Sequence, residues 1–120
     1  MILSNQQINS YKQDGAIVIR DIFKPWINHL REGFEKVLKN PGPHARENTN
    51  NNESGRFFED YCNWDRIPEF QKFAKESPAA QIIGEATDSK SIQVFHDHIF
   101  VKEPSTNKPT PWHQDMPYYC

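Results

Sequence analysis

Residues 91–102 are a long β-favouring run, and the segments that follow them constrain the fold more than any other part of the sequence. A proline-rich connection over residues 103–111 comes next, and a short stretch rich in aromatic and polar residues, 112–119, follows it. This order predicts a strand, a turn and a second short strand. Such a pair of strands, with polar side chains at its open end, is how the rim of a β-barrel is built.

Side chains of the predicted strand alternate between the two faces of a sheet. One face carries the even-numbered residues Ile92, Val94, His96, His98, Phe100 and Lys102. The other face carries Gln93, Phe95, Asp97, Ile99 and Val101. Two histidines and a lysine are unusual on one face of a strand. They are expected either to contact a ligand or to face solvent and satisfy backbone groups.

His113 and Asp115 lie in the second short strand, one residue apart. On an extended segment side chains repeat every second residue, so both project to one side, where an imidazole and a carboxylate can bind adjacent positions on one metal ion. Two histidines and one carboxylate on one face, with the opposite positions open, are typical of non-haem Fe(II) oxygenases. The pair supplies two of these three ligands.

Other interpretations of these polar residues stay open. A His-x-Asp triplet also arises by chance as an exposed polar turn, and the flanking segments are what favour metal binding here. His96 and His98 are a rival ligand pair because a strand places both on one side, but they rank below His113 and Asp115. Cys62 has no partner at metal-ligand spacing and is predicted to be a packed thiol.

The N-terminal 90 residues are predicted to be mainly helical. Ser4 and Gln7 form a capping box for a helix that ends near Gln13. Residues 16–20 then indicate a short buried strand. Pro25 opens a second helix, whose apolar stripe at a period near 3.6 is Trp26, Leu30, Phe34, Val37 and Leu38.

Residues 44–55 are rich in asparagine and are predicted to form a mobile loop or lid. His44 and Arg46 lie in it, either as solvated loop residues or as contacts to a substrate. Residues 56–58 should be extended again. Two further helices are expected, over residues 68–75 and 78–84, each with a proline in its first turn. Together the helices would form a buttress on one face of the sheet.

Composition excludes several classes of protein. A formal net charge of −2 argues against a nucleic-acid binder that neutralises phosphates. No apolar run approaches the roughly 18 residues of a membrane span, and the first residues lack the basic and apolar regions of a signal peptide. At 120 residues the chain is one domain at most. Its default location is cytoplasmic.

A resemblance to a known family rests on Phe100-Val101-Lys102-Glu103-Pro104, followed by Pro109-Thr110-Pro111-Trp112-His113-Gln114-Asp115-Met116-Pro117-Tyr118. This segment is similar to the strand, Lys-x-Pro turn and Thr-Pro-Trp-His-Gln-Asp-x-Pro-Tyr segment of the phytanoyl-CoA dioxygenase-like branch of the Fe(II)/2-oxoglutarate dioxygenases. Weaker agreement covers the rest of the chain, from Asp14-Gly15 onward.

The resemblance implies an α+β fold: the N-terminal part of a double-stranded β-helix, a jelly-roll or cupin-like barrel with buttressing helices, here truncated. Residues 1–120 would be one incomplete dioxygenase domain. Within it, residues 1–90 would be mainly the helical buttress, and residues 91–120 would be the first barrel strands.

The resemblance also implies a set of site residues. Members of the family hold Fe(II) with His-x-Asp and a distal His, and they anchor 2-oxoglutarate with an Arg beyond that His. His113 and Asp115 match the first two ligands, whereas the distal His and Arg do not occur in this sequence. His96 and His98 would contact the cosubstrate or the substrate. Lys102 would either support the Lys-x-Pro turn or contact an acidic ligand.

The implied activity is hydroxylation of a small organic or acyl substrate, with O2 and 2-oxoglutarate consumed and succinate and CO2 released. The carboxylate of Asp115 favours hydroxylation over the halogenation found in relatives with a small residue there. Without the distal residues the chain alone is expected to be inactive. The alternative is a non-catalytic binding or scaffold relative of the same fold. The sequence specifies neither the substrate nor the oligomeric state, and it indicates no nucleic-acid or membrane partner.

Overall fold

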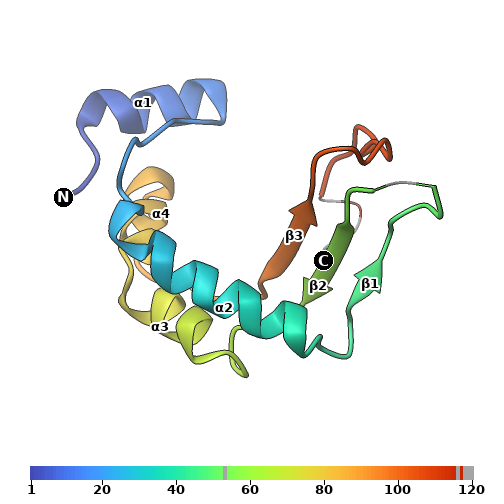
Figure 1. Ribbon diagram of the computed structural model, residues 1–120. Coiled ribbons are helices and arrows are strands. Elements are labelled where there is room, and N and C mark those ends of the chain that lie inside the picture. Colours follow the sequence, from blue (N-terminus) through green and yellow to red (C-terminus); the bar gives the residue numbers. More distant parts are fainter. Residues whose placement is uncertain (53, 116, 118–120) are drawn as a thin grey trace.

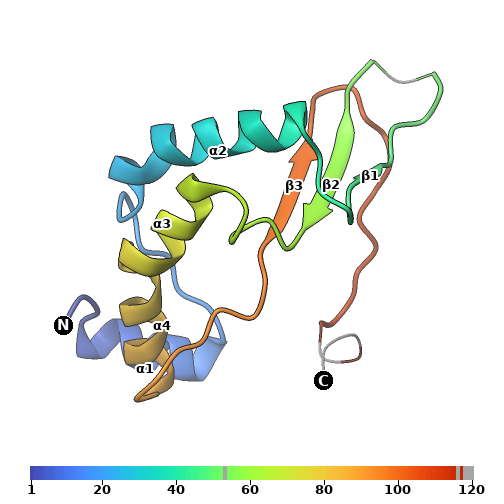
Figure 2. The same ribbon diagram turned by 90° about the horizontal axis from the view of Figure 1, so that it is seen from below.

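The computed structural model describes residues 1–52, 54–115 and 117, so Tyr118 of the predicted motif lies outside the described residues. Within the described part, four α-helices and a three-stranded antiparallel sheet form a mixed α+β arrangement (Figure 1). The sheet lies against the C-terminal part of helix α2 (Ile27–Lys39), and helices α1 (Asn5–Asp14) and α4 (Ala79–Thr87) lie toward the N-terminal end of α2 (Figures 1 and 2). The predicted α+β class is confirmed. The sheet does not close into a barrel within the described residues.

Helix α1 (Asn5–Asp14) begins and ends as the sequence predicts. The Ser4 hydroxyl accepts the Gln7 backbone N–H at 3.2 Å, and the Gln7 side chain accepts the Ser4 backbone N–H at 2.9 Å. This reciprocal pair is the predicted capping box. Gly15 ends the helix with a φ of 73°, a left-handed conformation that glycine adopts without steric cost, and its N–H donates to the Tyr11 carbonyl.

Helix α1 packs against α4 (Ala79–Thr87), and the residues before α1 attach to the same helix. The Glu85 carboxylate accepts the backbone N–H groups of Ile2 and Leu3, and the Leu3 side chain is buried. The hydrogen bond from Leu3, followed by one from Gln81, lowers the pKa of Glu85. The chain start is therefore held by both a charge-assisted contact and an apolar anchor.

The prediction of a buried strand over residues 16–20 is wrong. These residues belong to no strand of the described chain, and Val18 is 75% exposed. Ile17 and Ile19 instead line a cavity together with Ile82 and Ala86 of α4. Exposed and half-buried residues alternate along the segment, but no described strand lies beside it to complete a ladder. Its apolar side chains contact a helix instead.

The predicted second helix is confirmed, with a different first turn. Lys24–Trp26 form a short 3₁₀ helix, η1, and α2 follows it directly. The apolar stripe faces inward, where Val37 is completely buried. Gly33 lies on the same face, and a Cβ there would come 2.5 Å from the Phe70 ring. A glycine is thus required for the close approach of the next helix.

Helix α3 (Pro68–Glu76) is also confirmed, and it packs on α2. Lys36 donates a hydrogen bond to the Glu69 carboxylate across this contact, and that bond is the main cause of the lowered pKa of Glu69. Helix α4 continues past the predicted end at Gly84 to Thr87. The reason is that Ala86 is buried against its neighbours, so packing of the last turn offsets the low helix preference of one glycine.

The sheet has the order β1-β2-β3 with antiparallel pairing throughout. Strand β2 (Phe57–Tyr61) is central, and β3 (His98–Lys102) pairs with it from Phe57↔Lys102 to Tyr61↔His98. The strand predicted over residues 91–102 is therefore too long at its start. Pairing ends at Tyr61 because Cys62 turns the chain with a φ of 58°, which leaves residues 91–97 beyond the ladder.

The prediction for residues 44–55 is partly wrong. Arg46–Glu47 form the short edge strand β1, with Arg46 opposite Glu59 and Glu47 opposite Phe58. The Glu47 carboxylate accepts hydrogen bonds from Arg56 and from the Thr49 hydroxyl. These polar contacts explain how a segment without branched apolar residues joins the sheet.

The two faces of the sheet differ. The inner face packs on α2 and α3 around a core of Val37, Phe58, Ile67, Phe70 and Ile99. The outer face carries Phe57, Glu59 and Tyr61 of β2 next to His98, Phe100 and Lys102 of β3. No helix of the described chain covers it (Figure 1). The predicted alternation is confirmed for residues 98–102, and α2 and α3 of the predicted helical buttress cover one face of the sheet, as expected.

Candidate functional site

His113 and Asp115 lie in the segment after β3, close to one another. The His113 Nε2 and Asp115 Oδ1 atoms are 3.5 Å apart, and the His113 Nδ1 atom lies 2.7 Å from the Pro111 carbonyl oxygen. The two side chains are 48% and 75% exposed. Residues 112–115, which belong to the predicted second strand, form no strand, and in Figure 2 the chain after β3 passes beside β1 before it leaves the sheet.

The donor set fits two ligands of one metal ion. Imidazole nitrogens and carboxylate oxygens bind transition metals at about 2.0–2.2 Å, so two such atoms on one ion can be at most about 4.4 Å apart. The separation of 3.5 Å between His113 Nε2 and Asp115 Oδ1 lies within that limit. A proton on Nδ1, donated to the Pro111 carbonyl, would leave the Nε2 lone pair for a metal. Among the described residues, no third ligand joins them.

His98 is held in place on the outer face of the sheet. Its ring stacks on the Tyr61 ring with centroids 3.9 Å apart and planes 18° apart. Its Nε2 atom lies 3.5 Å from the Glu59 carboxylate. His96 precedes β3 and lies farther from Tyr61, at 6.1 Å between ring centroids. The two predicted cosubstrate contacts therefore meet at one tyrosine.

Lys102 lies at the other end of β3. Its Nζ donates to the Lys108 carbonyl and lies 5.2 Å from the centre of the Phe57 ring. In the structure it supports the turn that follows the strand. His98 and Lys102 share the outer face, as the sequence predicts. Among the described residues, they do not form a metal-binding group with His113 and Asp115.

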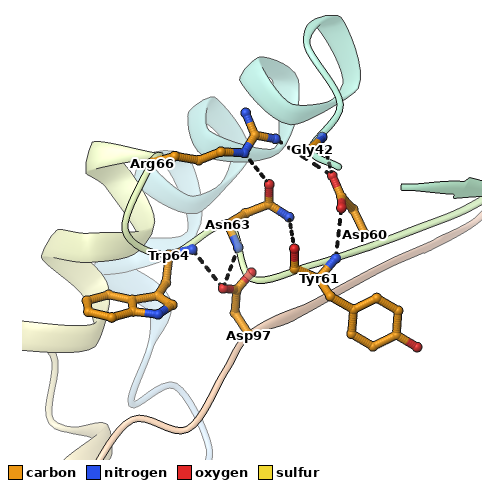
Figure 3. Close-up of polar contacts among 7 residues, drawn as sticks. All are labelled: Gly42, Asp60, Tyr61, Asn63, Trp64, Arg66 and Asp97. Atoms are coloured by element: carbon orange, nitrogen blue, oxygen red, sulfur yellow. Dashed lines mark hydrogen bonds and ion pairs between the residues drawn. The ribbon is translucent and has the colours of Figure 1, made fainter. Parts of the chain in front are cut away.

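A buried polar network fixes the end of the sheet that presents Tyr61 and His98 (Figure 3). Asp97 Oδ1 accepts the backbone N–H groups of Asn63 and Trp64 at 2.8 and 2.7 Å. The Asp97 carbonyl also accepts the Cys62 N–H. The turn after β2 is thereby attached to the residue just before β3.

The same network extends to the connection between α2 and β1. Asp60 is completely buried, and its Oδ2 atom accepts the Gly42 N–H at 2.7 Å while its Oδ1 atom accepts the Tyr61 N–H. Arg66 donates to the Asn63 side chain at 2.5 Å and lies 3.7 Å from Asp60. Buried carboxylates need such partners because an unpaired buried charge is costly.

Sequence reasoning missed this network. One signal was available: Asp60 follows Phe58 at the inward position of β2, where a carboxylate is out of place unless it is bonded. Asp97 likewise lies on the face opposite His96 and His98. The prediction that Cys62 is a packed thiol is wrong, because Cys62 lies on the turn and is exposed.

An apolar cavity of about 410 Å³ lies on the helical side of the sheet, between α2, α3, α4 and residues 92–99. Its polar lining comes mainly from residues 93 and 96–98. It offers apolar burial but few hydrogen-bonding groups. None of the described helices has the length and apolarity to cross a membrane.

The comparisons with known proteins agree with the His-x-Asp motif. The family model for phytanoyl-CoA dioxygenase (PhyH) matches residues 11–120, a stretch that includes His113 and Asp115. No curated protein and no solved structure matches the chain. Because the family model covers most of the sequence, the chain belongs to the phytanoyl-CoA dioxygenase family.

Proposed function

We propose that this chain contributes two iron ligands, His113 and Asp115, to an Fe(II)- and 2-oxoglutarate-dependent oxygenase. The enzyme would hydroxylate a small organic or acyl substrate and release succinate and CO2. The observation that carries the proposal is the 3.5 Å separation of His113 Nε2 and Asp115 Oδ1 inside the matched family region.

The chain's own residues would orient the metal ligands. The Pro111 carbonyl faces His113 Nδ1, which fixes the imidazole and directs Nε2 toward Asp115. The Asp115 carboxylate supplies a negative charge that favours a divalent cation. When bound, Fe(II) would supply the activation of O2 and the oxidation of a substrate C–H bond.

The outer face of the sheet would bind the cosubstrate or the substrate. His98 is oriented by Tyr61 and Glu59, so its imidazole has a fixed direction before any ligand arrives. Lys102 would contact the acidic cosubstrate by exchanging the Lys108 carbonyl for a carboxylate oxygen. His96 would contribute from the segment just before β3.

Succinate formation tests this proposal. A polypeptide that contains this chain together with a distal His and Arg would be given Fe(II), 2-oxoglutarate and O2, and succinate would be followed by NMR. We expect O2-dependent succinate, and we expect Asp115→Ala to abolish it while Asp65→Ala, an exposed aspartate elsewhere, leaves it unchanged. Iron binding without any succinate would instead support the non-catalytic relative.

A further inference from the structure

A second polar site lies at the edge of the sheet, where the connection from α2 to β1 meets the end of β2. It is a cleft of about 280 Å³ lined by Pro43, His44, Ala45, Arg46, Tyr61 and Cys62. Its ionisable lining includes a guanidinium and an imidazole, and no carboxylate lines it. The cleft therefore presents positive charge without an acid to balance it.

Arg46 is the source of that charge. Its partner in the ladder is Glu59, an acid that could have neutralised it. Glu59 instead lies beside the His98 imidazole, and Arg46 forms no ion pair with any described residue. The other arginine of this region, Arg56, behaves differently, because its Nε atom lies 2.7 Å from the Glu47 carboxylate. One guanidinium is paired, whereas its neighbour has no acidic partner among the described residues.

The wall of the cleft is held from behind by the network in Figure 3. The Gly42 N–H donates to buried Asp60, and the Gly42 carbonyl accepts the Ala45 N–H at 3.2 Å. The Arg46 backbone is fixed by its pairing with β2. Because these contacts order the wall without a ligand, binding would lose little conformational entropy there.

The position of the cleft relates it to the candidate cosubstrate face. Tyr61 belongs to both: it lines the cleft, and its ring stacks on His98. Figure 3 shows the phenol directed away from the buried network. A ligand that reaches the cleft would therefore lie at the edge of the outer face rather than on the helical side.

We propose that this cleft binds an anionic group of the substrate, a carboxylate or a phosphate, with Arg46 as its principal donor. A guanidinium presents parallel N–H groups whose geometry matches either anion. His44 would add a second donor from the same wall, and the Tyr61 ring would give an apolar side. Anion binding at Arg46 stands by itself, whereas its role in substrate recognition rests on the proposed oxygenase function.

The test is an NMR titration of the chain with inorganic phosphate and, separately, with acetate. We expect saturable shifts of the backbone amides of residues 44–46 and 61–62. Arg46→Gln should weaken binding by at least about tenfold, the loss expected for a charge-assisted hydrogen bond. Arg31→Gln is the matched control, because Arg31 is an exposed arginine of α2 that does not line the cleft, and it should bind as the wild type does. Tighter binding of phosphate than of acetate would indicate that the cleft recognises a phosphate group of the substrate, and the reverse order would indicate a carboxylate.

Two results would overturn the assignment: an unchanged affinity in Arg46→Gln, or an equal loss in Arg31→Gln, which would mean general attraction to positive charge. Arg46→Lys, which keeps the charge without the planar fork, should fall between wild type and Arg46→Gln, and it replaces the latter if that variant does not fold. Fe(II) binding at His113, measured on the same samples, separates the two proposals, since each can fail while the other holds.

Discussion

Replacing Gly33 by alanine should destabilise the chain, although alanine is the better helix former. An added Cβ would lie 2.5 Å from Phe70 Cε1 and 2.9 Å from Cδ1, whereas ordinary contacts begin at 3.4 Å. The Phe70 ring cannot simply withdraw, because it is 7% exposed and meets Phe34 edge-on at 5.6 Å between ring centroids. Either the ring or the α2–α3 spacing must change.

The magnitude follows from two opposing effects. Overpacking of a core site costs about 1–3 kcal/mol, and exchanging glycine for alanine inside a helix gains about 1 kcal/mol, so the free energy of unfolding should fall by up to about 2 kcal/mol. Urea unfolding followed by circular dichroism would detect this as a midpoint lowered by up to about 1 M. Glu32→Ala, on the exposed side of α2, should change stability by less than about 0.5 kcal/mol.

The same substitution in a Phe70→Leu background is the decisive control. A smaller side chain leaves room for the Cβ, so Gly33→Ala should then stabilise the chain, by about 1 kcal/mol at most. If Gly33→Ala raised the stability of the wild type, the proposed close contact between α2 and α3 would be refuted.

Two further predictions concern polar contacts. The lowered pKa of Glu85 means that its contribution to stability is complete above its usual value of 4.5 and is lost as the pH falls through the lowered pKa. As the pH falls below 4.5, the free energy of unfolding of the wild type should therefore decrease more than that of Glu85→Gln in a series of urea melts. Parallel curves for the two proteins would contradict this assignment. Asp97→Ala should cost about 2–5 kcal/mol, since it leaves the N–H groups of Asn63 and Trp64 without an acceptor. Asp97→Asn keeps an oxygen acceptor and should restore most of the loss; equal stability of the two variants would argue against these hydrogen bonds.

The helices could be predicted from sequence because their signals are local. The capping box at Ser4, the glycine at position 15 and the apolar period of α2 all lie within a few residues of what they determine. The end of α4 was misjudged because it depends on burial of Ala86, a contact with other elements rather than a feature of the helix itself.

The strands were harder because pairing is not local. The start of β3 is set by the turn at Cys62, about 36 residues earlier in the chain, and the strand-like segment 16–20 has no partner among the described residues. The asparagine-rich composition of residues 44–55 predicted a loop there and gave no signal for β1. The pairing of β1 depends on Arg56 and Thr49 holding Glu47, which composition does not reveal.

The candidate site also has a part that local sequence predicts and a part that depends on contacts between distant residues. The spacing of His113 and Asp115 is readable from two residues, and their proximity needs no tertiary contact. The network around Asp60 and Asp97 joins residues from three connections and could not be found by spacing. The cleft at Arg46 depends on the side chain of Glu59 lying beside His98, which no sequence pattern specifies.

Fe(II) binding at the His-x-Asp pair tests most directly whether His113 and Asp115 are iron ligands. Fe(II) is paramagnetic, so it broadens the NMR signals of the nearest side chains, and an oxygen-free titration reports even weak binding residue by residue. We predict that the His113 imidazole signals broaden first, before those of His44, and that Asp115→Asn removes this preference while Asp65→Asn does not. Equal broadening of His113 and His44 in the wild type, or an unchanged preference in Asp115→Asn, would contradict the assignment of His113 and Asp115 as iron ligands.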